Sequence, residues 1–161
     1  MILALISLAL LTAYLIYAIR QIKSVPDSIS DTYYQLEKRD CPKWLFQLTM
    51  VAAAYVMLPT WIDQSNVNIQ FLAFLSCAGL TFVGMSPLFK LKLEGKVHYV
   101  SAAICGGCAV LWLILSGMWY LPALFFFVAI VLAYRWSRLM FWVECAAFAS
   151  TYAGLIIKTV A

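Results

Sequence analysis

An apolar segment of the chain begins with Lys96-Val-His-Tyr-Val-Ser-Ala-Ala-Ile-Cys-Gly-Gly-Cys108 and continues to about Trp119. A helix needs about 20 consecutive apolar residues to cross a bilayer, so this segment predicts a transmembrane helix over residues 97–118. The i, i+3, i+4, i+7 spacing of a helix brings its small and polar side chains to one face, which we expect to contact protein. This face comprises His98, Ser101, Ala102, Cys105, Ala109 and Trp112.

The composition of the whole chain indicates that its solvent is a membrane. Of the 161 residues, 65% are hydrophobic and 11% are charged, whereas soluble domains have roughly 45–50% and about 25%. So few charged residues could not cover the surface of a soluble globule, but a surface that faces lipid needs none. A soluble domain is therefore excluded, and an all-α polytopic integral membrane protein is predicted.

Six apolar segments with short polar connections predict six transmembrane helices in a single domain, residues 1–161. We expect the first segment to be retained, because it has no basic region before it and no small-residue cleavage site after it. A tight turn is expected at Leu121-Pro122, between the fourth and fifth spans. The six predicted spans are residues 2–19, 44–61, 69–85, 97–118, 122–134 and 139–157.

The longest polar segment, residues 20–43, follows the first span. Pro26 followed by Asp27 and Ser28 is typical of a helix start, since a side-chain oxygen there can accept hydrogen bonds from the first turn. We expect a short helix that lies in the membrane interface with its aromatic rings at headgroup level. Its apolar residues are Ile29, Tyr33, Tyr34 and Leu36.

Basic residues concentrate in three of the five predicted connections. Ten of the eleven Lys and Arg residues lie in the first, third and fifth, and only Lys158 lies elsewhere. Cytoplasmic loops carry the excess of basic residues, so both termini are predicted to be non-cytoplasmic, in a plasma or inner membrane. The pattern does not suit nucleic-acid binding, and no such partner is expected. The ten residues are Arg20, Lys23, Lys38, Arg39, Lys43, Lys90, Lys92, Lys96, Arg135 and Arg138.

Stripes of small residues predict which helices pack closely. Small side chains let helix backbones approach one another in a membrane, so the third, fourth and sixth spans are expected to form the core. The fifth span is almost purely lipophilic over residues 124–132, and we expect it to be peripheral. Beside the face of the fourth span, the stripes comprise Ala73, Cys77, Thr81 and Gly84 in the third and Ala146, Ser150 and Gly154 in the sixth.

Polar side chains from separate parts of the chain are predicted to meet at the cytoplasmic end. His98, Ser101 and Glu144 lie within spans, and the first polar segment adds Ser30 and Asp31. A carboxylate roughly 8 Å into a transmembrane helix is costly unless it is paired or hydrated. The candidate ligand-binding residues are therefore Asp31, His98, Ser101, Glu144 and Ser30, with Asp27, Ser28 and Glu94 nearby.

Two interpretations apply to each ionisable residue within the spans. Glu144 either pairs with a basic residue (Arg138, Arg135 or Lys96) or belongs to a binding site. His98 either caps the start of its helix or serves the site, for example as a general base. Each could supply the other with a hydrogen bond or a compensating charge, so we expect His98 and Glu144 to act as one unit facing a cytoplasmic cavity.

No metal or cofactor is predicted. His98 is the only histidine, and one histidine with scattered carboxylates does not form the ligand set of a zinc site. The five cysteines are odd in number and four lie within apolar spans, so no disulfide framework is implied. Cys105 and Cys108 have the spacing of a redox pair, but a thiolate near mid-helix would be poorly solvated. Packing of small residues between helices is the alternative interpretation.

Three short elements resemble six-span membrane proteins of the DRAM/Sfk type. They are Ser28-Ile-Ser-Asp-Thr32 after the first span, Gly84-Met-Ser-Pro87 at the end of the third, and Glu94-Gly-Lys-Val-His-Tyr-Val-Ser-Ala102 at the start of the fourth. The resemblance to ceramidase and adiponectin-receptor-like hydrolases of the CREST superfamily is more distant. It implies six spans and a lipid-related setting. Because those hydrolases bind their metal with three histidines, it does not imply a zinc amidase or lipase.

The sequence leaves three functions open. We expect a non-enzymatic protein with a lipid-associated or regulatory role, whose cytoplasmic cavity binds a headgroup or a small polar ligand. An enzyme acting on a lipid of the cytoplasmic leaflet would need at least two convergent polar groups. An oligomeric transporter or channel would need polar groups near mid-membrane or broken helices. Expected partners are membrane lipids, a second copy of the chain or another membrane protein.

Overall fold

The computed structural model describes residues 1–89 and 91–160, with side chains for all of these except residues 91–94. Lys90 and the side chains of Lys92 and Glu94, which belong to the third connection, lie outside the described residues. Every regular element within the described residues is helical. The elements are α1 (Ile2–Ile22), α2 (Asp31–Glu37), α3 (Trp44–Asp63), η1 (Val67–Ile69), α4 (Gln70–Met85), η2 (Ser86–Leu88), α5 (Leu91–Leu115), α6 (Tyr120–Trp136) and α7 (Leu139–Val160).

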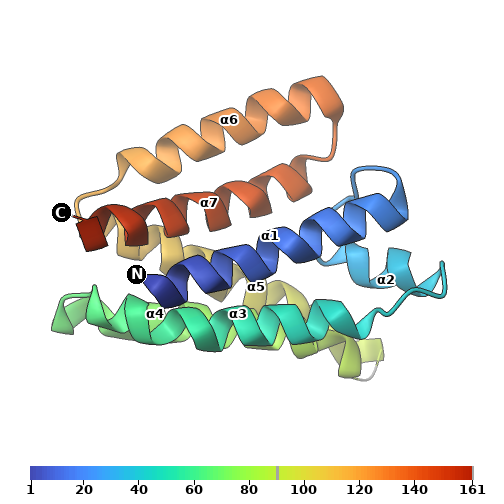
Figure 1. Ribbon diagram of the computed structural model, residues 1–161, viewed down its shortest axis with the longest axis horizontal. Helices are drawn as coiled ribbons and strands as arrows, with labels where there is room; N and C mark the ends of the chain where they lie inside the picture. Colours follow the sequence, from blue (N-terminus) through green and yellow to red (C-terminus); the bar gives the residue numbers. More distant parts are fainter. Residues whose placement is uncertain (90, 161) are drawn as a thin grey trace.

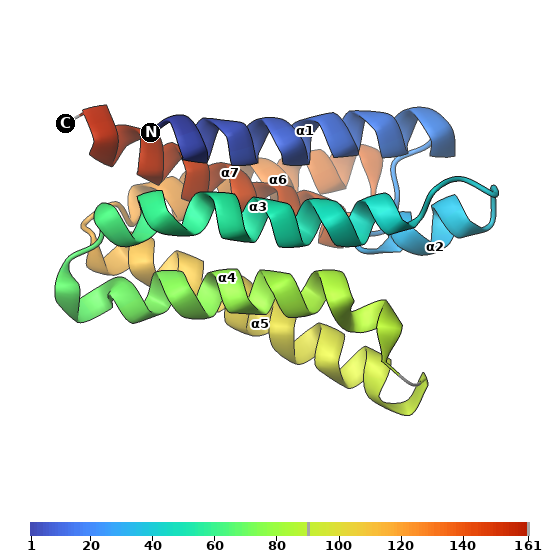
Figure 2. The ribbon, with the colours of Figure 1, turned by 60° about the horizontal axis from the view of Figure 1, so that its bottom comes forward.

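The long helices lie side by side, and consecutive ones run in opposite directions (Figures 1 and 2). Both termini lie at one end of the bundle, with the connection between α3 and α4, and α2 lies at the opposite end (Figure 1). α1 packs on α3, α3 on α4, α4 on α5 and α6 on α7, while α7 also contacts α1 and α5. The first, third and fifth connections, which carry most of the basic residues, therefore share the α2 end.

Five helical segments are long and apolar enough to cross a membrane: α1, α3, the segment Val67–Leu88 that contains α4, α5 and α7. α6 is also apolar but has only 17 residues. Large hydrophobic side chains are exposed on several helices, as expected of a surface that faces lipid. Examples are Tyr55, Phe74, Phe82, Leu111 and Phe127. The chain thus has the all-α architecture and helix composition of a multi-pass membrane protein.

The predicted spans agree with α1, α3, α4 and α7 to within one helical turn at each end. α5 begins at Leu91 rather than at residue 97 and ends at Leu115. The predicted turn at Leu121-Pro122 is wrong, because the chain turns at Gly117, whose φ of 78° suits glycine. Pro122 instead lies in the first turn of α6, where a missing backbone donor costs little.

Glycine lets α4 approach its neighbours closely. A Cβ on Gly79 would lie 2.8 Å from the backbone nitrogen of Cys105 and 2.8 Å from the carbonyl oxygen of Ser101, both in α5. Gly84 makes a similar approach to α3. Ser76 Oγ adds a hydrogen bond to the Cys105 carbonyl oxygen at 2.8 Å. Close backbone contact of this kind is the usual basis of helix association in membranes.

Of the five segments long enough to cross a membrane, the one that contains α4 is the most buried, and the one in α5 is the least. Buried residues make up 50% of the apolar stretch within Val67–Leu88 and 39% of the apolar stretch in each of α3 and α7. In Gly95–Leu115 they make up only 22%. The prediction that the fourth span belongs to the core is therefore wrong in part, since α5 buries only one face. α3, which no small-residue stripe singled out, belongs to the core. α6 packs mainly on α7 at the edge of the bundle, so its predicted peripheral position is confirmed (Figure 1).

Polar side chains connect α1, α3 and α7 inside the bundle. Ser7 Oγ donates a hydrogen bond to the Ala53 carbonyl oxygen at 2.8 Å and accepts one from the Tyr152 hydroxyl at 2.5 Å. Ser7, Ala53 and Tyr152 are buried. Because lipid offers no hydrogen-bond partners, such groups must be satisfied between helices.

α2 closes one end of the bundle. Thr32 Oγ1 accepts a hydrogen bond from the Tyr14 hydroxyl of α1 at 2.5 Å, and the helix contacts both α1 and α3. The predicted interfacial helix is therefore wrong in part: the helix forms, but of its predicted apolar residues only Tyr34 is exposed. The buried ones are Ile29, Tyr33 and Leu36.

Candidate functional site

A cavity of about 950 Å³ lies between α5, α6 and α7 and is lined at one end by residues 27–34. Along α5 it extends from Gly95 to Val110, roughly 22 Å at about 1.5 Å per residue. α6 packs on α7 and hardly touches α5, which leaves room between α5 and α6. The lining residues are Asp27, Ser28, Ser30, Asp31, Tyr34, Gly95, His98, Tyr99, Ala102, Ala103, Gly106, Gly107, Val110, Phe126, Met140, Val143, Glu144 and Ala147.

Four of the five candidate residues line this cavity. Ser30 and Asp31 reach it from the start of α2, His98 from α5 and Glu144 from α7. Ser101 does not line it, because this residue is buried on the face of α5 that packs against α4. The fold thus brings polar groups from three elements to one place. That His98 and Glu144 act as one unit stays a prediction.

Glu144 lies in the second turn of α7. Its Oε2 accepts a hydrogen bond from the Ile29 backbone N–H at 2.5 Å. The predicted pairing with Arg138 is wrong, since Arg138 forms an ion pair with Asp27. The Asp27 carbonyl oxygen also accepts from the Phe141 N–H at 3.1 Å. These contacts hold the segment before α2 against the first turns of α7, and Glu144 obtains a neutral partner instead of a cation.

The segment before α2 is shaped by its own polar side chains. Ser28 Oγ accepts a hydrogen bond from the Asp31 N–H at 3.0 Å, which confirms the predicted helix-start signal. Asp31 Oδ2 accepts from the Asp27 N–H at 3.3 Å and from Gln35 Nε2 at 3.4 Å. Ser30 is nearly buried between α2 and the cavity. Local hydrogen bonds therefore fix the carboxylate of Asp31 at the polar end of the cavity.

His98 lies well inside α5, so the prediction that it caps the start of a helix is wrong. Its Nδ1 lies 3.1 Å from Ser86 Oγ, and Ser86 Oγ in turn donates to the Val83 carbonyl oxygen at 2.9 Å. With the hydroxyl proton used in this way, Ser86 accepts from His98, which places a proton on Nδ1. The geometry therefore orients the histidine ring and does not activate Ser86 as a nucleophile.

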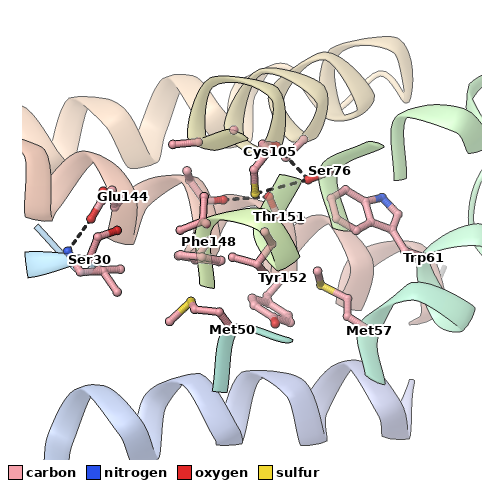
Figure 3. Close-up of a pocket in the computed structure, with 17 residues that line it drawn as sticks. Ser30, Met50, Met57, Trp61, Ser76, Cys105, Glu144, Phe148, Thr151 and Tyr152 are labelled. Atoms are coloured by element: carbon pink, nitrogen blue, oxygen red, sulfur yellow. Dashed lines mark hydrogen bonds between the residues drawn. The ribbon is translucent and has the colours of Figure 1, made fainter. Parts of the chain in front are cut away.

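A second cavity, of about 90 Å³, lies inside the bundle. It shares five lining residues with the first: Ser30, Ala102, Gly106, Glu144 and Ala147. Figure 3 shows Ser30 and Glu144 at one side of it and Trp61 at the other. Its walls are mostly apolar, with Ser76, Cys105, Thr151 and Tyr152 among the exceptions. Glu144 thus stands between the larger cavity and the interior of the bundle.

Several wall residues of the larger cavity could not be predicted. Tyr34 was expected at the lipid interface, and Tyr99 and Phe126 carried no pattern of their own. The segment Cys105-Gly-Gly-Cys108 was a candidate for packing of small residues between helices, and this is wrong for its two glycines, since a Cβ on either would have no neighbour within 4 Å. For the two glycines, however, the sequence did contain a signal that they lie outside the helix contact. On a helical projection Gly106 lies at the edge of the small polar face of α5, and Gly107 lies opposite that face.

Within the described part of the chain, no group of three or more His, Cys, Asp and Glu side chains is arranged to hold a metal ion. Comparison of the chain with models of known protein families, with curated proteins and with solved structures finds no match. A functional assignment therefore depends on the chemistry of the cavity.

Proposed function

We propose that this chain is a six-span membrane protein that binds a membrane lipid in the cavity between α5, α6 and α7. The observation that carries the proposal is the amphipathic lining of the cavity. Its α2 end presents Asp31, His98 and Glu144, whereas Val110 and Phe126 form its apolar depth. Its length of roughly 22 Å is more than half of the thickness of a hydrocarbon core, which is about 30 Å. The polar end therefore suits a lipid headgroup, and the apolar part suits an acyl chain.

A binding or regulatory role accounts for this site better than catalysis does. An acyl-transfer or hydrolysis site needs an activated nucleophile or water beside a base. The serine that contacts His98 is buried and uses its proton on a backbone carbonyl. The resemblance to DRAM/Sfk-type proteins supports the same lipid-related setting, with a second copy or another membrane protein as further partner.

The lipid-binding proposal is tested by filling the cavity. Gly106→Phe is expected to lower the lipid retained through purification about tenfold, because the ring would occupy space that is open beside Gly106. Native mass spectrometry of the purified protein measures the retained lipid. Leu111→Phe enlarges an outward-facing residue of the same helix and is expected to retain lipid like the wild type. Ala103→Phe fills the cavity independently, and wild-type retention in both filled variants would contradict the proposal.

We also propose that α6 crosses the membrane and that both termini are non-cytoplasmic. The grouping of the basic connections at the α2 end supports this orientation. Single cysteines are introduced at the exposed positions Asn66 and Arg39 in a variant that lacks Cys41. Asn66→Cys is expected to react with a membrane-impermeant maleimide added to intact cells. Arg39→Cys is expected to react only after the membrane is permeabilised, which gives the reagent access to the cytoplasmic side. Labelling of both from the same side would refute the orientation.

A further inference from the structure

The polar end of the cavity is acidic. Asp27, Asp31 and Glu144 line it beside His98, and among the residues that the structure describes its lining includes no Lys or Arg. Arg138 pairs with Asp27. The hydrogen bonds described for the other two carboxylates come from the Ile29 N–H to Glu144, and from the Asp27 N–H and Gln35 Nε2 to Asp31, which are neutral donors. The cavity therefore has the opposite sign of charge from the basic connections around it.

Aromatic rings and hydroxyl groups accompany these carboxylates. Tyr34 and Tyr99 line the same end of the cavity, and the face of a tyrosine ring attracts cations, quaternary ammonium groups included. Ser28 and Ser30 also line it, and their oxygens can accept hydrogen bonds from a primary ammonium group. An anionic headgroup would instead face two carboxylates in an environment of low dielectric constant, where like charges repel strongly.

We propose that the ligand is an amphiphile with an ammonium headgroup, which Asp31 and Glu144 bind through charge while the apolar walls accept its chain. The carboxylate of Glu144 lies within a long apolar helix, where it is costly unless it is paired or hydrated, and a bound ammonium group would pair with it. This inference rests on the proposed lipid-binding function. Zwitterionic phospholipids and single-chain amines share the chemistry that the site recognises.

The test is a competition between lipids for the whole chain. The purified protein is incubated in detergent with equimolar dioleoyl phosphatidylcholine, phosphatidylethanolamine and phosphatidylglycerol, together with sphingosine, and bound lipid is identified by native mass spectrometry. We expect ammonium-bearing lipids to be retained about tenfold over phosphatidylglycerol, a difference of about 1.4 kcal/mol. The three phospholipids share a phosphate, so this contrast isolates the ammonium group. Preference for the phospholipids supports a zwitterionic ligand, and preference for sphingosine supports a single-chain amine.

Charge-removing variants show whether the two carboxylates cause the preference. The double variant Asp31→Asn, Glu144→Gln keeps oxygen acceptors for the neighbouring backbone amides but loses both charges. It is expected to bind as much total lipid with a preference below about twofold. Asp40→Asn removes an exposed carboxylate at the same end, outside the cavity, at a φ of 53° that asparagine tolerates. This control is expected to keep the full preference.

Two results would overturn the inference: equal retention of phosphatidylglycerol and phosphatidylcholine by the wild type, or an unchanged preference in the double variant. Gly106→Phe separates this failure from failure of the proposed function. If Gly106→Phe lowers the binding of all four lipids while the wild type shows no headgroup preference, the cavity binds lipid and only the ammonium assignment is wrong. If neither Gly106→Phe nor Ala103→Phe changes any binding, the lipid-binding function itself is wrong.

Discussion

Replacing Gly79 with leucine is expected to prevent the bundle from folding. α4 and α5 share the most extensive helix contact of the described residues, and a Cβ at position 79 would lie 2.8 Å from backbone atoms of both Ser101 and Cys105. Overpacking costs about 1–3 kcal/mol where side chains can adjust. Backbone atoms of a helix cannot rotate away, so α4 and α5 would have to separate, and we expect a loss above about 3 kcal/mol.

The measurement is thermal unfolding of detergent-purified variants, with the monodisperse fraction recorded for each. Gly107→Leu is the matched control, because a Cβ there meets nothing within 4 Å, and we expect it to change stability by less than about 1 kcal/mol. Gly154→Leu is expected to cost less than Gly79→Leu, since its Cβ would clash with a side-chain methyl of Leu113, and a side chain can shift where a helix backbone cannot. Melting of Gly79→Leu at the wild-type temperature would show that α4 and α5 do not pack as described.

Replacing Trp112 with alanine is expected to destabilise the end of the bundle that holds both termini. The Trp112 ring is fully buried and packs edge-on against Trp61, with centroids 5.4 Å apart. Its Nε1–H donates to Ser65 Oγ at 2.7 Å, and Lys158 Nζ lies 5.5 Å from its ring centroid. One side chain of α5 therefore connects to α3, to the connection after it and to α7. Loss of a buried tryptophan costs about 3–5 kcal/mol in soluble proteins.

In a membrane the cost of this substitution comes mainly from lost packing and an unsatisfied polar group, so we expect about 3 kcal/mol, the lower end of that range. Trp119→Ala is the control at the same end, because Trp119 is 64% exposed, and a change below about 1 kcal/mol is expected. Trp112→Phe should recover most of the packing and lose about 1 kcal/mol for the hydrogen bond. Equal unfolding temperatures for Trp112→Ala and Trp119→Ala would contradict this account.

The helices and their order followed from the sequence alone. Apolar length and helical periodicity are local properties, so the boundaries of α1, α3, α4 and α7 were predictable to within a turn. The alternating direction of consecutive helices also follows from their short connections. It explains why Asp31, His98 and Glu144 could be expected at one end before any contact was known. The burial of Ala109 and Trp112 on one face of α5 confirms the prediction made from their spacing.

Tertiary structure alone decided how these helices meet. Glu144 accepts from the Ile29 amide, and a backbone donor carries no residue-type signal that a sequence could reveal. Gly79 contacts α5 closely while Gly106 and Gly107 face open space, although all three are glycines in apolar helices. Which glycine packs depends on the rotation and separation of the helices, and these are set by side-chain fit between segments far apart in the chain. For the same reason, the cavity between α5 and α6 became visible only in the folded protein.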